Sequence, residues 1–140
     1  MKRNELKLIL RRGTVLYKNI RGLTSSEPHY LIILNNPKEH NGAVVSVVTS
    51  QIEKRRERIL FFGLHESSLV ILPKFCYQHF SKDSAVDCNV VGIIPFDDLL
   101  TYTPQDFKSP DFPHEYINQI IQRVLESPKV QPSIKKILSA

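Results

Sequence analysis

The feature that most constrains this chain is a series of short, apolar and often β-branched segments in its first 95 residues, without helical periodicity between them. The expected strands are residues 13–18, 29–34, 43–50, 59–62, 69–72 and 89–94. A parallel, doubly wound sheet needs a helix between successive strands, and none is indicated before residue 95. The pattern therefore predicts a mainly β protein with an antiparallel sheet that is strongly bent or closed into a small barrel.

One connection between the expected strands is unusually charged. Residues 51–58 contain four Lys or Arg side chains and join strands 43–50 and 59–62, so the simplest interpretation is a hairpin with a basic tip. Such a tip can follow a phosphate backbone. It can equally be a solvated turn that protects a sheet edge from aggregation, because Glu53 and Glu57 interrupt the positive charge.

Helical signals gather in the last third of the chain. Apolar residues recur at helical spacing between Tyr116 and Leu125, with Pro113 as a start signal and Pro128 as a stop signal, which predicts a helix over residues 111–127. Residues 131–139 are expected to form a second, short helix. With 140 residues, the chain has the length of one domain, so we expect residues 1–140 to fold as a unit whose barrel spans residues 11–102.

Composition and charge narrow the function classes. The apolar fraction of 41% and the charged fraction of 24% are typical of soluble globular chains. No apolar run approaches the length of a membrane span, and Leu8-Ile9-Leu10 is too short for a signal peptide, so we expect a cytoplasmic protein. The net charge of +5 suits a polyanionic partner, although modest positive charge is also common among proteins that bind none.

Several kinds of active site lack their usual motifs. The chain has no Gly-x-x-x-x-Gly-Lys loop for phosphate and no Gly-x-Ser-x-Gly turn for a nucleophilic serine. Cys76 and His79 have the only spacing that resembles a metal site, and no second close pair accompanies them. We therefore expect neither a metal nor a cofactor.

A different constellation arises from the order of the strands. If strands 29–34 and 43–50 are antiparallel neighbours, His29 at the start of one lies near Thr49 and Ser50 at the end of the other. A histidine beside hydroxyl donors, near cationic residues such as Arg21 and those of residues 54–58, is what metal-free RNA cleavage requires. The alternative is that Thr49 and Ser50 only cap a strand end and that His29 is a half-buried strand residue.

Four segments, taken in order, resemble a known family. They are Gly13-Thr14-Val15-Leu16, the aliphatic run that ends at Leu34, Val47-Val48-Thr49-Ser50-Gln51-Ile52 and Leu69-Val70-Ile71-Leu72. This order is similar to that of the PemK/MazF toxins of bacterial toxin–antitoxin systems, over about residues 11–102. The Val-Thr-Ser-Gln stretch is the most specific part of the resemblance.

The resemblance implies an SH3-like barrel with a C-terminal helix, a homodimer, a cognate antitoxin protein as partner and endoribonuclease activity without a metal. It puts the family's hydroxyl at Thr49, with Ser50 beside it. Where these toxins usually carry an arginine ahead of the second strand, this chain has Glu27-Pro28-His29. The expected catalytic residues are thus His29, Thr49 and Ser50, and the expected RNA-binding residues are Arg21, Lys54, Arg55, Arg56 and Arg58.

Two alternatives remain open from the sequence. Tyr17, Tyr30 and Tyr77 are able to stack on RNA bases, but tyrosines in strands more often belong to the core or to a dimer contact. The whole protein can also be a catalytically inactive barrel module that binds RNA or a protein partner.

Overall fold

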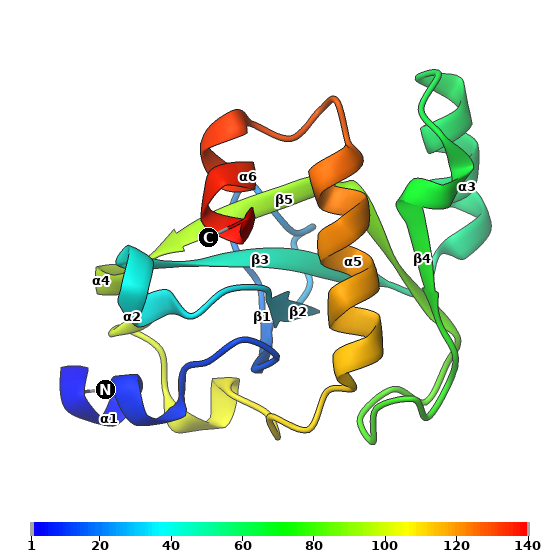
Figure 1. Cartoon of the computed structure of the whole chain (residues 1–140). Coiled ribbons are helices and arrows are strands. Elements are labelled where there is room, and N and C mark those ends of the chain that lie inside the picture. The colour runs from blue at the N-terminus through cyan, green and yellow to red at the C-terminus, as the bar shows by residue number, and fades with distance from the viewer. Residues whose placement is uncertain (1, 140) are drawn as a thin grey trace.

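The computed structural model describes residues 2–139 and contains a five-stranded antiparallel sheet covered by helices (Figure 1). The strands are β1 (Val15–Lys18), β2 (His29–Ile33), β3 (Gly42–Thr49), β4 (Leu69–Leu72) and β5 (Ser84–Pro95). They are arranged in the order β1-β2-β3-β5-β4, and every neighbouring pair is antiparallel. The predicted antiparallel sheet is confirmed.

The helices are more numerous than the sequence pattern indicated. They are α1 (Arg3–Ile9), α2 (Pro37–His40), α3 (Ile52–Phe61), α4 (Phe96–Leu99), α5 (His114–Glu126) and α6 (Pro132–Ser139). The expected C-terminal helices are present, but three further helices precede residue 95, so the protein is mixed α/β and not mainly β. Among the described residues, no helix combines the length and the apolarity needed to cross a membrane.

The sheet is open and is not closed into the expected barrel. β1 pairs only with β2, and β4 pairs only with β5, so these two strands form the edges. The edge of β1 is partly covered by a later segment, because Phe107 forms a β-bridge with Leu16 and the Lys108 N–H donates to the Val15 carbonyl at 2.8 Å. The chain thus protects one edge locally, without joining β1 to β4.

The largest correction concerns the expected hairpin with a basic tip. Residues 51–58 are not a hairpin tip and residues 59–62 are not a strand, because this region forms α3. Ile52 and Ile59 are seven residues apart, or two helical turns, and both pack in one apolar cluster with Leu69 and Ala85. The remaining positions are mostly Glu, Lys and Arg, which are good helix formers. Most of the charged run is therefore the exposed side of an amphipathic helix, while Arg56 is half-buried on the same side as Ile52 and Ile59.

β5 contains a marked irregularity. Ser46 of β3 faces Val91, whereas Val48, two residues further along β3, faces Val86, five residues back along β5. Three additional residues of β5 are thus accommodated between these two pairs, which bends the strand. One half of β5 pairs mainly with β3, and the residues from Ser84 to Asp87 also pair with β4.

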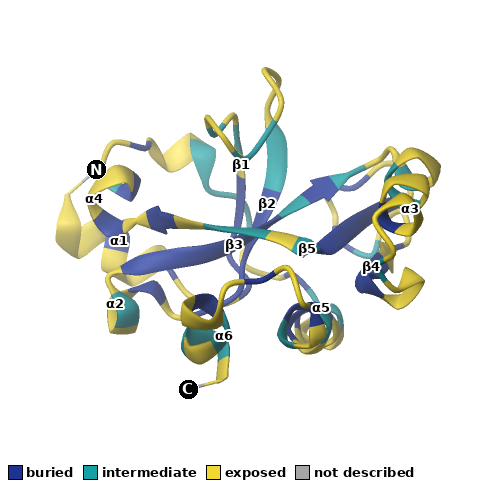
Figure 2. Cartoon of the chain, turned by 90° about the horizontal axis from the view of Figure 1, so that it is seen from above, coloured by how far each residue is buried: buried dark blue, intermediate teal, exposed yellow. Residues whose placement is uncertain are grey.

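The core lies on both faces of the sheet (Figure 2). On one face, side chains of α5 and α6 pack on Val15, Ile32 and Val44. On the opposite face, α1 and α4 pack on Leu31 and Val45. Residues 31 and 32 alternate between the faces, as neighbouring residues of a strand must. Because helices cover both faces of the sheet, a site is most accessible at the strand ends and in the connections between strands.

Candidate functional site

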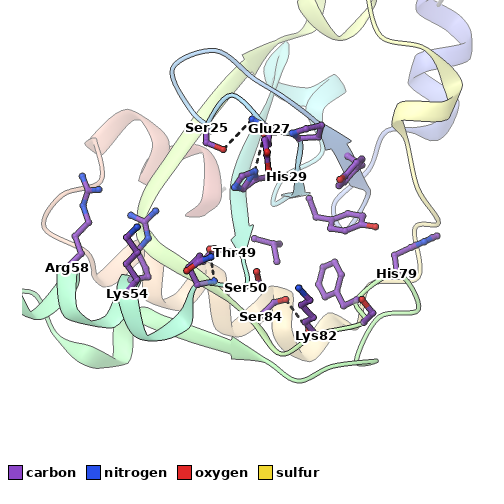
Figure 3. A pocket seen from close by; sticks show the side chains of 18 residues that line it. Ser25, Glu27, His29, Thr49, Ser50, Lys54, Arg58, His79, Lys82 and Ser84 are labelled. Carbon is purple, nitrogen blue, oxygen red and sulfur yellow. Dashed lines mark hydrogen bonds between the residues drawn. The ribbon is translucent and has the colours of Figure 1, made fainter.

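A cleft of about 840 Å³ opens where β2 begins and β3 ends (Figure 3). Four parts of the chain line it. They are Tyr17 of β1, residues 25 and 27–30 at the entry to β2, residues 48–51, 54, 55 and 58 at the end of β3 and on α3, and residues 79–82 and 84 before and at the start of β5. The cleft is thus formed by segments that are distant in the sequence.

The strand register explains why His29 and Thr49 share this cleft. β2 and β3 pair Leu31 with Val47, and the same antiparallel register continued by two residues sets His29 opposite Thr49. Both residues also lie on the same face of the sheet as that pair, since each is two positions away from it. The structure therefore brings together His29, Thr49 and Ser50, the three residues selected from the sequence.

The imidazole of His29 is held in a defined way. Its Nδ1 lies 3.2 Å from the backbone carbonyl oxygen of Glu27, and the ring is half-buried at the first position of β2. A carbonyl oxygen only accepts hydrogen bonds, so we assign the proton of the neutral ring to Nδ1. The Nε2 lone pair of the neutral ring is then free to take a proton.

The two hydroxyl groups at the end of β3 differ in exposure. Thr49 is half-buried, and its Oγ1 accepts a hydrogen bond from the Gln51 backbone N–H at 3.1 Å. This bond stabilises the turn between β3 and α3, which agrees with the alternative that Thr49 caps the end of the strand. It uses an oxygen lone pair and leaves the hydroxyl proton available for a ligand. Ser50 is exposed beside it.

Positive charge enters the cleft from α3 and from the connection before β5. Lys54, Arg55 and Arg58 project from α3, where spacings of three and four residues put 54 and 55 on the same side as 58, and Lys82 comes from the connection before β5. Glu27 supplies the one carboxylate among the residues that line the cleft.

The cations of the cleft are not equally free. Arg55 Nη1 lies 3.8 Å from the buried Asp87 carboxylate, whereas Lys54, Arg58 and Lys82 form no ion pair with any residue from 2 to 139. These three cations are the ones available to an anion.

Two of the RNA-binding residues expected from the sequence do not line the cleft. Arg21 is exposed in the connection between β1 and β2. Arg56 also projects from α3, but it forms ion pairs with Glu53 and with Glu66, 3.1 Å from the latter. Its guanidinium is committed to these carboxylates: Glu53 lies on α3 itself, and Glu66 links the helix to the turn that precedes β4.

The connection between β4 and β5 brings residues to the cleft that sequence reasoning did not select. His79, Phe80 and Lys82 all line it. Their position follows from strand direction. β3 ends opposite the start of β5, since Thr49 faces Ala85, and the antiparallel strand β4 ends there too, so the connection from β4 to β5 lies at the same end of the sheet. Without knowing that β5 pairs with both β3 and β4, this end could not be assigned.

Aromatic rings form the side of the cleft away from α3, where Lys82 also lies (Figure 3). The centroids of Tyr17 and Tyr30 are 4.6 Å apart, and the ring of Tyr30 also packs on Phe80 and His79. Burial raises the pKa of Tyr30, and the neighbouring Tyr17 adds to this effect. The phenol of Tyr30 therefore stays neutral over the physiological range and is a ring surface, not an anion.

Comparisons with family models and with curated proteins identify no family for this chain. No protein-family model matches the chain, and a search of curated proteins finds no similar sequence. Among residues 2–139, no group of three His, Cys, Asp or Glu side chains is arranged to hold a metal ion.

Proposed function

We propose that this cleft binds single-stranded RNA and cleaves it without a metal, in the manner of the PemK/MazF toxins that the sequence resembles. One observation carries the proposal: His29, Thr49, Ser50 and the unpaired cations Lys54 and Arg58 line a single cleft. On the basis of the resemblance, we also propose that the open sheet is related to an SH3-like barrel, that the protein forms a homodimer and that an antitoxin protein is its partner.

The cleavage is an attack of a ribose 2′-oxygen on the adjacent phosphorus. Nε2 of His29 takes the proton of the 2′-OH, the new P–O2′ bond forms, and the P–O5′ bond breaks. The products are a 2′,3′-cyclic phosphate and a 5′-hydroxyl, whose oxygen takes its proton from solvent. The contact from Glu27 suits this role, because it keeps the proton on Nδ1 and leaves Nε2 as the base.

The hydroxyl groups and the cations act on the charge that develops on phosphorus. Thr49 and Ser50, which line the cleft, donate hydrogen bonds to the non-bridging oxygens, where negative charge grows as the 2′-oxygen attacks. Lys54 and Arg58 offset the charge of the backbone phosphates along the cleft. His29 stands near the position where the resembling toxins have an arginine, so the permanent positive charge comes here from α3.

A second function is favoured by one specific contact. Because Thr49 accepts the Gln51 N–H, the hydroxyl has a structural role that needs no catalysis. The same cleft in a catalytically inactive module would bind RNA without cutting it. The two functions differ in whether RNA is cut, and in nothing that concerns binding.

The test compares cleavage of a long single-stranded RNA in EDTA by wild type and by His29→Gln. We expect His29→Gln to lose about 100-fold or more in rate, because a positioned base contributes at least that much. Thr49→Val is also expected to be slow. His114→Gln is the matched control, since His114 is exposed at the start of α5 and does not line the cleft.

One result opposes the nuclease, and another opposes the role of His29. If wild type binds the RNA but leaves it intact at stoichiometric protein, the inactive module is the better description. If His29→Gln is folded by circular dichroism and cuts as fast as wild type, the role given to His29 is wrong. Analysis of the product ends for a 2′,3′-cyclic phosphate checks the direction of attack independently of rate.

A further inference from the structure

The aromatic side of the cleft has a use that the cleavage step does not require. Tyr17, Tyr30 and His79 form a continuous row, with Tyr30 in the middle, 4.6 Å from Tyr17 and 6.4 Å from His79 between ring centroids. The planes of Tyr30 and His79 are inclined by only 29°. We call these three residues the aromatic row.

The row differs from an ordinary aromatic core because its ends are open. Tyr17 is 41% exposed, and its hydroxyl makes no hydrogen bond with residues 2–139; His79 is exposed as well. Tyr77 lies nearby but is 2% exposed, and its hydroxyl donates to the Ser109 carbonyl. Tyr77 is therefore a core residue that supports His79, while Tyr17 and His79 present ring surfaces to the cleft.

The aromatic row also lies next to His29, the proposed base. Tyr30 follows His29 directly in β2, so the two side chains leave opposite faces of the strand at its end. In Figure 3, Lys54 and Arg58 lie on one side of His29 and Thr49, and His79 lies on the other. A nucleotide at His29 thus has the cations of α3 on one side for its phosphates, and the rings, with Lys82 near them, on the other side for its base.

We propose that the aromatic row is a nucleobase-binding site, on which unpaired bases of the RNA stack. This inference rests on the proposed function and deepens it, because it makes the bases a source of affinity in addition to the phosphate backbone. Stacking on aromatic rings accepts any base and requires that the base be unstacked from its own helix. The row therefore selects single-stranded over double-stranded RNA.

The test measures binding without cleavage. The probe is a short, end-labelled 2′-O-methyl oligouridine, in which the attacking hydroxyl is blocked, and its counterpart of equal length has abasic residues at the inner positions. Fluorescence anisotropy gives both affinities at one salt concentration. We expect the abasic oligomer to bind wild type about tenfold more weakly, since each stacked base contributes roughly that factor.

Three variants locate the effect. Tyr17→Leu is expected to bind the intact oligomer about as weakly as wild type binds the abasic one, whereas Tyr17→Phe keeps the ring and is expected to bind normally. Phe61→Leu is the matched control, because Phe61 is an 83% exposed aromatic residue on α3 that does not line the cleft. Circular dichroism of Tyr17→Leu checks that β1 is intact.

The outcomes separate this inference from the function on which it rests. Equal affinity of wild type for the intact and abasic oligomers, or an unchanged affinity in Tyr17→Leu, overturns the base site and leaves an RNA cleft that reads only phosphates. Failure of wild type to bind either oligomer overturns the base site and the proposed function together. Base-dependent binding without any cleavage of RNA supports the aromatic row and contradicts the nuclease.

Discussion

At the scale of single residues, the two histidines of the cleft have different surroundings and hence different uses. His29 has its Nδ1 against the Glu27 carbonyl oxygen, which orients the ring and defines its free nitrogen. His79 packs on Tyr30 and Tyr77 and presents a ring face. The first arrangement suits proton transfer and the second suits stacking, although both side chains have the same chemistry in water.

Asp106 provides a test of pH dependence at this scale. Burial alone raises the pKa of Asp106, but hydrogen bonds from Thr103 and the Lys18 ammonium, 3.2 Å away, outweigh it and hold the pKa below its ordinary value of 3.8. A lowered pKa stabilises the folded state above pH 3.8, and this stability is lost as the pH falls through the folded-state value. Asp106→Asn is therefore expected to lower the free energy of unfolding by about 1 kcal/mol at neutral pH.

Urea unfolding of wild type and Asp106→Asn at neutral pH and at about pH 2 measures this difference. The gap between the two proteins is expected to narrow as the pH falls below 3.8 and through the lowered folded-state pKa of Asp106, because the carboxyl then becomes protonated. Asp98→Asn is the control, because the exposed Asp98 side chain makes no ion pair with residues 2–139. A gap of constant size would mean that the contribution of Asp106 does not depend on its charge.

At the scale of elements, α3 determines where the positive charge of the cleft lies. Its apolar residues Ile52 and Ile59 face the sheet, its Arg56 is tied to Glu53 and Glu66, and its Lys54 and Arg58 remain free toward the cleft. The helix thus has one side that faces the sheet, on which Arg56 accompanies Ile52 and Ile59 at spacings of four and three residues, and a different side that carries Lys54 and Arg58. A hairpin tip in its place would have exposed all of these cations equally to solvent.

This division of roles predicts the salt dependence of RNA binding. For single strands, the logarithm of the affinity falls with the logarithm of salt by about 0.7 per neutralised phosphate. The double variant Lys54→Gln/Arg58→Gln is expected to reduce this slope by about 1.4, because both cations contact phosphates. Lys136→Gln, which removes an exposed cation from α6, is expected to leave the slope unchanged. A slope that falls equally in both proteins would indicate binding to net charge alone.

The elements also show which parts of the fold and of the cleft could be predicted from the sequence. β-branched runs such as residues 43–50 and the helical spacing of residues 116–125 are strong local patterns, and the corresponding strand and helix are present. α3 was missed because its charged residues concealed a two-residue apolar pattern, Ile52 and Ile59. His79 and Lys82 were missed because their position depends on the pairing of β5 with two strands, which no local pattern reveals. That His29 and Thr49 lie in the same cleft could be predicted, since consecutive strands most often pair with each other.

At the scale of the whole molecule, the sheet joins two apolar clusters into one cooperative structure. β2 contributes Ile32 to the cluster under α5 and Leu31 to the cluster under α1 and α4. Loss of packing on either face therefore disturbs the same strand. We expect residues 2–139 to unfold in one transition, without a stable half.

Two truncations of fully buried side chains test this unity. Ile120→Ala on the α5 side and Leu31→Ala on the opposite face are each expected to lower the free energy of unfolding by about 2–5 kcal/mol. Both variants are expected to shift one common thermal transition, seen alike by far-UV circular dichroism and by calorimetry. Leu8→Ala, at an 85% exposed position of α1, is the control and is expected to change stability by less than about 0.5 kcal/mol. Two separated transitions in either core variant would contradict a single unit.

The three additional residues of β5 limit how the length of this chain can change. The bent stretch holds Asp87, which faces Arg55 of α3, and Asn89, which donates to Ser68 and accepts from Ser127 after α5. A deletion that made the pairing with β3 continuous would remove or redirect these side chains and break the polar contacts that tie α3, Ser68 and the end of α5 to the sheet, leaving both helices held by their apolar packing alone. Although this stretch is the least regular part of the sheet, its length is accordingly set by contacts with its neighbours.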